Sequence, residues 1–154
     1  MVKTLHNRPG SATRTPNAGE LLEGLFELAV VLTGSMDNGL AERGLTRARA
    51  ELLWHLRRQP GVIQRELSQA LRCTPRNVTD LVDALEASGL VARGPHPTDR
   101  RATLVRLTRR GISEVARMQA GYQALAATLF ADLPPSELAA FGTVLNQILG
   151  RLRQ

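Results

Sequence analysis

Hydrophobic residues recur at helical spacing near both ends of this 154-residue chain. Residues 21–32 place leucine, valine and phenylalanine on a helical face that is wider than a single packing partner covers. Residues 115–129 and 138–152 each repeat apolar positions at alternating steps of 3 and 4, and Pro134-Pro135 separates the two segments. We therefore predict long helices at both ends of the chain, with apolar seams suited to packing against other helices.

The middle of the chain predicts three shorter helices followed by a β-hairpin. The helices are expected over residues 46–56, 64–71 and 75–88, and the strands over residues 90–93 and 102–107. Thr46 and Thr74 can cap the first and third of these helices, and Gly89 ends the third. The predicted fold class is mainly α with a small β-hairpin wing: a winged helix-turn-helix flanked by dimerisation helices.

The net charge of +6 is confined to one third of the chain. Residues 57–110 hold 11 arginines against 5 acidic residues, whereas the remainder is neutral overall. A positive field over a helix-turn-helix pattern is typical of a DNA-binding face. Aromatic residues make up only 3% of the chain, which argues against single strands bound by stacking. Double-stranded DNA is therefore the expected partner.

The helix over residues 75–88 is expected to read DNA sequence. Its apolar residues share one face, so its first turn offers Arg76, Asn77 and Thr79 to base edges. Arginine can pair bidentately with guanine and asparagine with adenine, and Asp80 could accept a hydrogen bond from cytosine. Ordinary solvated polar side chains are the alternative for this set. We prefer that alternative for Asp83, because a second carboxylate at the groove would repel phosphate.

The predicted hairpin tip carries Asp99-Arg100-Arg101. Asp99 can hold the guanidinium of Arg101 in a fixed fork, and a narrow minor groove attracts such an arginine. A surface ion pair worth about 0–1 kcal/mol is the alternative interpretation. Arg109 and Arg110 open the next helix, where the macrodipole disfavours cations. Their placement suggests an external anion such as phosphate, with solvated side chains as the alternative.

Several segments together resemble the MarR family of winged-helix transcription regulators. They are Leu45-Thr46, Gln64-Arg65-Glu66-Leu67, the run from Pro75 to Val82, and Asp99-Arg100-Arg101 followed by Leu107-Thr108. The resemblance covers about residues 18–153. It implies a homodimer joined through its terminal helices, with recognition helices in successive major grooves and Arg101 in the minor groove. Family members commonly repress, and many release DNA when a small anionic or phenolic effector binds between the dimer helices and the DNA-binding lobe.

The residue patterns and the resemblance together set the expected organisation and sites. Residues 1–17 are expected to be a disordered tail and residues 18–154 a single MarR-like domain. Within it, residues 46–108 form the winged helix-turn-helix lobe, and residues 18–44 and 109–154 the dimerisation helices. The expected DNA-binding residues are Arg72, Thr74, Arg76, Asn77, Thr79, Asp80, Asp99, Arg100, Arg101 and Arg109. The expected ligand-pocket residues are Phe26, Val30, Trp54 and His55.

Arg72 departs from the family pattern, because many relatives have glycine in the turn before the recognition helix. If the backbone there needs a positive φ, arginine carries strain that glycine would not. Either the turn differs locally, or an additional phosphate contact compensates.

Other chemistries are not indicated. The chain shows neither a nucleophile–base pair nor a phosphate loop, so we do not expect an enzyme. Its 3 histidines lack ligand spacing, and we expect neither a metal nor another cofactor. Cys73 falls where the turn normally buries a small apolar side chain, which we favour over a redox role.

Two other functions remain open from the sequence. A nonspecific architectural DNA-binding protein would share the basic field without needing a shaped recognition helix. A winged-helix protein-interaction adaptor is also possible, although it leaves the localised charge unexplained. No apolar run reaches the roughly 18 residues of a membrane span, and the N-terminus does not resemble a secretory signal, so we expect a cytoplasmic protein.

Overall fold

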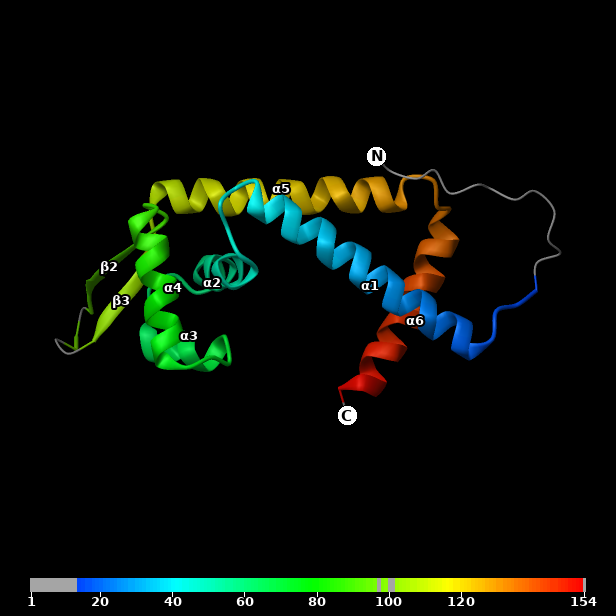
Figure 1. The fold of residues 1–154 in the computed structure, drawn as a ribbon, viewed down its shortest axis with the longest axis horizontal. Coiled ribbons are helices and arrows are strands. Elements are labelled where there is room, and N and C mark those ends of the chain that lie inside the picture. The colour runs from blue at the N-terminus through cyan, green and yellow to red at the C-terminus, as the bar shows by residue number, and fades with distance from the viewer. Residues whose placement is uncertain (1–13, 97, 100–101, 154) are drawn as a thin grey trace.

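Six helices and a three-stranded sheet make up the part of the chain that the structure, a computed structural model, describes: residues 14–96, 98–99 and 102–153. In chain order they are α1 (Ala18–Ala41), α2 (Arg47–Arg58), β1 (Val62–Ile63), α3 (Gln64–Ala70), α4 (Pro75–Ala87), β2 (Val91–Pro95), β3 (Thr103–Leu107), α5 (Arg109–Phe130) and α6 (Pro135–Leu152). Figure 1 shows a lobe formed by α2–α4 and the sheet, from which α1, α5 and α6 extend to one side. The predicted mainly helical fold with a small wing is confirmed.

The hydrophobic core lies inside the lobe and is closed by the first half of α5. Its fully buried side chains are Leu52, Leu53, Leu56, Leu67, Val78, Val82, Leu85, Val91, Val105 and Val115. They come from α2, α3, α4, both long strands and α5, so each element contributes one apolar face. This shared burial fixes how α4 and the hairpin sit relative to each other.

The sheet has the order β1-β3-β2, and both pairings are antiparallel. Val62 of β1 pairs with Val105, while Val91 of β2 pairs with Leu107. The β2–β3 hairpin is the predicted wing, with strand limits that differ from the prediction by one or two residues. The strand β1 was not predicted.

The start of α5 is held against the end of α4 by hydrogen bonds and by close backbone packing. Thr108 caps α5, because its Oγ1 accepts a hydrogen bond from the Gly111 backbone N–H at 3.0 Å. The same hydroxyl donates to the Gly89 carbonyl at 2.7 Å. Gly111 packs so closely that a Cβ there would lie 2.0 Å from the carbonyl oxygen of Leu90. Only glycine fits this approach.

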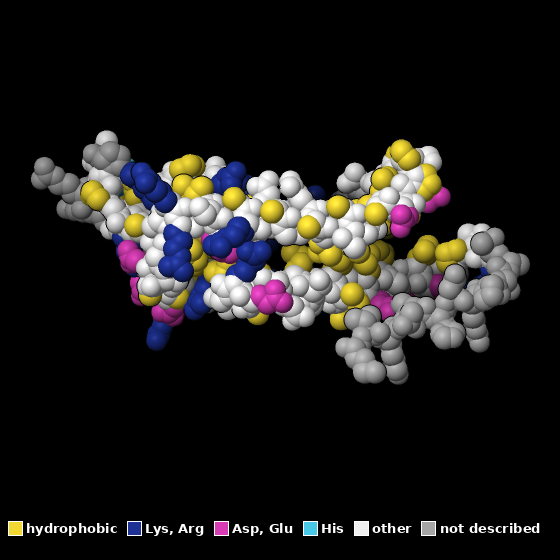
Figure 2. Space-filling model, turned by 90° about the horizontal axis from the view of Figure 1, so that it is seen from above, with side chains coloured by type: hydrophobic (Ala, Val, Ile, Leu, Met, Phe, Trp, Pro, Cys, Tyr) yellow, Lys and Arg dark blue, Asp and Glu magenta, His cyan; other side chains and the backbone are white. Residues whose placement is uncertain are grey.

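The helical arms leave much of their apolar surface uncovered in the single chain. Neither α1 nor α6 has a buried residue. Their exposed large hydrophobic residues are Leu21, Leu22, Phe26, Leu28, Val30, Val31, Met36, Phe141, Val144 and Leu152. Figure 2 shows hydrophobic side chains gathered in the hollow between two elongated parts of the molecule that extend from the lobe. Among the described helices, none is long and apolar enough to cross a membrane.

Candidate nucleic-acid interface

The helix α4 has the capped start and the two-sided character predicted for it. Thr74 is its N-cap, and the Thr74 Oγ1 accepts a hydrogen bond from the Asn77 backbone N–H at 3.2 Å. Pro75 occupies the first helical position, where its missing N–H leaves no unpaired donor. The buried residues Val78, Val82 and Leu85 anchor the helix in the core. Its opposite face is therefore free to meet a ligand.

That opposite face carries the predicted base-reading residues. Arg76, Asn77, Thr79 and Asp80 are all exposed. Arg76 and Asp80 make no side-chain hydrogen bond or ion pair with another described residue, so their polar groups are available to an external partner. Figure 2 shows Lys and Arg side chains gathered over the end of the molecule that carries the lobe.

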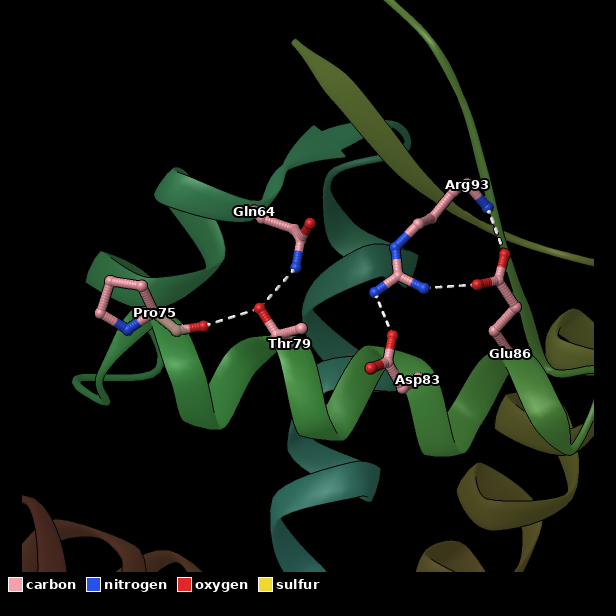
Figure 3. Close-up of polar contacts among 6 residues, drawn as sticks. All are labelled: Gln64, Pro75, Thr79, Asp83, Glu86 and Arg93. Atoms are coloured by element: carbon pink, nitrogen blue, oxygen red, sulfur yellow. Dashed lines mark hydrogen bonds and ion pairs between the residues drawn. The ribbon is translucent and has the colours of Figure 1, made fainter.

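Thr79 is more constrained than the sequence suggested. Its hydroxyl donates to the Pro75 carbonyl at 3.0 Å and accepts a hydrogen bond from the Gln64 side-chain amide at 3.3 Å (Figure 3). The second contact joins α4 to the first residue of α3. Thr79 therefore helps to hold the helix-turn-helix pair together, and only part of its hydrogen-bonding capacity faces outward.

Arg93 of β2 connects the wing to α4, a contact that was not predicted from the sequence. Its guanidinium binds Asp83 at 2.5 Å and also pairs with Glu86, while its backbone N–H donates to Glu86 at 3.1 Å (Figure 3). The backbone hydrogen bond from Arg93, followed by the side-chain one, lowers the pKa of Glu86 below its ordinary value. Asp83, which we predicted to be a solvated residue away from DNA, is thus tied to Arg93.

The wing tip is closed by backbone hydrogen bonds. The His96 N–H donates to the Ala102 carbonyl at 3.3 Å, and the Ala102 N–H donates to the Asp99 carbonyl at 3.1 Å. The His96 Nδ1 accepts from the Asp99 backbone N–H at 3.1 Å. Asp99 is exposed at this tip. Arg100 and Arg101, the arginines predicted to meet the groove, lie outside the described residues.

Two further predicted DNA contacts are arginines at element ends. Arg72 is exposed in the turn between α3 and α4 and has a positive φ of 50°. Arg109 is exposed at the first position of α5. Cys73 follows Arg72 and is half-buried against the core, which agrees with the apolar role favoured for it.

A cavity of about 570 Å³ lies between the lobe and the arms. Its walls include Met36, Leu40, Trp54 and Tyr122. Three arginines, Arg43, Arg47 and Arg58, and two glutamates, Glu42 and Glu51, also line it. Arg47 is held by both carboxylate oxygens of Asp37 at 2.8 and 2.9 Å. Arg58 has no acidic partner among the described residues. The cavity therefore combines aromatic side chains with one arginine, Arg58, that is not paired with a carboxylate of the described residues.

The predicted ligand-pocket residues are only partly brought together. Trp54 lines the cavity, but His55, Phe26 and Val30 do not. The Nε2 atom of His55 is buried and has no hydrogen-bond partner among the described residues. Phe26 and Val30 lie on α1 and are 66% and 72% exposed.

The comparisons with known proteins agree with this geometry. The MarR family model matches residues 45–103, which span α2 to the start of β3. The HTH-type transcriptional repressor Rv2887 of Mycobacterium tuberculosis is 27% identical over 124 residues, covering 80% of this chain and 89% of that protein. Over residues 45–103, this chain is therefore similar to the MarR family.

Solved structures of other proteins share the fold. A MepR mutant of S. aureus superposes with a TM-score of 0.78 at 23% identity, covering 88% of this chain and 98% of that one. RV1404 from Mycobacterium tuberculosis also gives 0.78, at 22% identity and with 91% and 97% of the two chains covered. Another MepR mutant, bound to an oligodeoxyribonucleotide, gives 0.68 at 25% identity, with 85% and 97% covered.

The similarity to the MarR family, the name of the repressor Rv2887 and the DNA-bound MepR mutant all indicate a DNA-binding transcriptional regulator. The exposed face of α4 and the wing are the surfaces that this fold presents for that role.

Proposed function

We propose that this chain is a MarR-family regulator, a ligand-responsive repressor that acts in the cytoplasm as a homodimer on a palindromic operator. The observation that carries the proposal is the first turn of α4, where a capped, core-anchored helix exposes Arg76, Asn77 and Asp80. In this arrangement Arg76 reads guanine and Asn77 reads adenine in the major groove. Arg109, Arg100 and Thr74 contact phosphates, and Arg101, oriented by Asp99, enters the minor groove.

The homodimer is supported by the uncovered apolar surface of the arms. Two long helices without a buried residue are unusual in a protein that stays monomeric, because exposed apolar patches of that extent favour association. A second copy of the chain would cover α1 and α6 by a two-fold contact. Such a dimer would place its recognition helices about 34–36 Å apart, matching half-sites one helical turn apart.

The effector is supported by the cavity beside Trp54. An aromatic carboxylate or phenolate would pack on Trp54 and Tyr122 while its anionic group meets Arg58. Arg43 also lines this cavity, and it lies 3.3 Å from Glu114, a buried carboxylate on α5. An anion that draws Arg43 away from Glu114 would change the packing of α5 against the lobe. This gives the effector a route to the DNA-binding surface.

The dimer is tested by replacing Leu145 and Ile148 of α6 with aspartate. Sedimentation should show a dimer for the wild type at micromolar concentration and a monomer for the double variant. The variant should keep the far-UV circular dichroism of a folded lobe yet lose tight DNA binding. A wild-type monomer at micromolar concentration would contradict the proposal.

The effector site is tested by fluorescence, because Trp54 is the only tryptophan of the chain. Benzoate, a simple aromatic carboxylate, should change the emission of Trp54 in a saturable manner and weaken DNA binding. Arg58→Ala should weaken both effects, whereas Arg151→Ala, at the far end of α6, should leave them unchanged. Equal responses from the two variants would remove Arg58 from the site.

A further inference from the structure

Three helices of this chain end in the same backbone motif. After α1, α3 and α4, the N–H groups of two successive residues bond back to carbonyls of the last turn. The first of the two donors is Gly44 after α1, Arg72 after α3 and Gly89 after α4. This is the Schellman arrangement, which requires a left-handed residue at that position and usually employs glycine.

Arg72 is the exception among these three ends. The φ angles are 68° at Gly44, 70° at Gly89 and 50° at Arg72. Among the described residues, Arg72 is the only non-glycine with a positive φ. A Cβ in this region meets the neighbouring carbonyl oxygen, so arginine destabilises the turn relative to glycine.

Nothing within the described part of the chain compensates for that strain. The Arg72 side chain is exposed and forms no hydrogen bond or ion pair with another described residue. The turn itself is firmly held, because the Ser68 hydroxyl donates to the Cys73 carbonyl at 2.6 Å and the Cys73 N–H donates back to the Ser68 carbonyl at 3.2 Å. The strained arginine is thus presented on a rigid turn.

Its position gives it a partner outside the chain. Arg72 lies two residues before Thr74, the N-cap of α4, and so stands beside the exposed first turn that carries Arg76 and Asn77. When that turn enters a major groove, the loop that leads into the helix faces the adjacent phosphate backbone. A guanidinium there can bind a phosphate with two parallel hydrogen bonds.

We propose that Arg72 is a phosphate-binding residue that strengthens DNA binding while it lowers the stability of the fold. The inference rests on the proposed DNA-binding mode. It predicts that stability and affinity move in opposite directions when Arg72 is replaced. It also predicts that the gain in affinity does not depend on base sequence, because phosphates are the same at every position.

The experiment compares Arg72→Gly, Arg72→Asn and Arg72→Lys with the wild type. Glycine and asparagine tolerate the left-handed backbone without the charge, and lysine keeps the charge. Melting temperature is measured without DNA, and affinity is measured on a mixed-sequence duplex of about 30 base pairs, long enough for two half-sites. Gly44→Arg serves as the matched control, because it places an arginine at the same motif position after α1, away from α4.

Arg72→Gly and Arg72→Asn should raise the melting temperature by about 2 °C or more. Both should weaken duplex binding about tenfold and lower the log–log salt slope by about 1 for each phosphate that the variant no longer binds. Arg72→Lys should keep most of the affinity and the salt slope. Gly44→Arg should lower the melting temperature and leave the affinity unchanged.

Unchanged affinity and salt slope in Arg72→Gly and Arg72→Asn, with wild-type binding intact, would overturn the phosphate role and leave the proposed function standing. A wild type that binds no duplex would overturn both. A melting temperature that falls in both variants would overturn the claim that the turn is strained by arginine.

Discussion

Arg93 binds Glu86 twice, through its backbone N–H at 3.1 Å and through its guanidinium, and so ties the first strand of the wing to the last turn of α4 (Figure 3). The same guanidinium reaches Asp83, one turn earlier on α4. Because both carboxylates lie on the recognition helix, the orientation of the wing depends on that helix. In a DNA complex, the two surfaces would then be presented as one unit.

Arg93→Ala should loosen the wing without unfolding the lobe. Because Asp83 and Glu86 are exposed, removing these ion pairs should lower the free energy of unfolding only slightly. Affinity for DNA should fall more clearly, since the wing must be ordered on binding. Chemical denaturation and duplex titration measure the two effects. A change confined to stability would mean that Arg93 has no part in DNA binding.

Glu86→Gln should remove part of the acid sensitivity of the fold. The pKa of Glu86 is lowered from its ordinary value of 4.5, first by the backbone hydrogen bond from Arg93. A depressed folded-state pKa stabilises the protein above the unfolded pKa, and this stabilisation is lost as pH falls through the lower folded value. The stability difference between wild type and Glu86→Gln should therefore shrink between about pH 6 and pH 3. A difference that stays constant over this range would show that the carboxylate is not linked to folding.

Gly111→Ala should be severely destabilising. An added Cβ would lie 2.0 Å from the Leu90 carbonyl oxygen, so α5 must shift away from the end of α4. We expect the free energy of unfolding to fall by about 2–3 kcal/mol, in the range seen for overpacked sites. Gly150→Ala is the matched control, because nothing lies within 4 Å of a Cβ there. Its stability should be unchanged or slightly higher. Equal effects of the two alanines in urea denaturation would refute the close approach.

Arg76→Ala should relax base preference at one position in each half-site and weaken binding by about 1–3 kcal/mol. The reason is that Arg76 is exposed on the first turn of α4. Its guanidinium forms no hydrogen bond or ion pair with another described residue. Affinities for a set of duplexes that differ at single positions measure the preference. Uniform weakening across all of them would show that Arg76 contacts only the backbone.

The helices and the wing could be predicted from the sequence because their signals are local. Periodic leucines, threonine caps and glycine stops all act within a few residues, and Thr46, Thr74 and Gly89 hold the positions predicted for them. The two-residue strand β1 (Val62–Ile63) was missed, because so short a run has no alternation to detect and exists only through its pairing with β3.

The contacts that shape the candidate site form between residues far apart in the sequence. They could therefore not be predicted from short stretches of neighbouring residues. Asp83 was interpreted as a solvated residue because a second carboxylate at the groove would repel phosphate. Nothing in the sequence indicates its contact with Arg93, 10 residues away. The positive φ at Arg72 was anticipated as one of two alternatives and is confirmed. Of the predicted pocket residues only Trp54 lines the cavity, whose arginines come from α2 and the turn between α1 and α2.

The most direct test of sequence-specific operator binding is selection of bound duplexes from a random library by the wild-type protein. We expect an enriched palindrome whose half-site centres lie about 10–10.5 base pairs apart, because two recognition helices related by a two-fold axis enter successive major grooves. The same enrichment should weaken at one base position per half-site for Arg76→Ala. Strong binding with no enriched sequence would contradict this expectation and identify a nonspecific architectural protein instead.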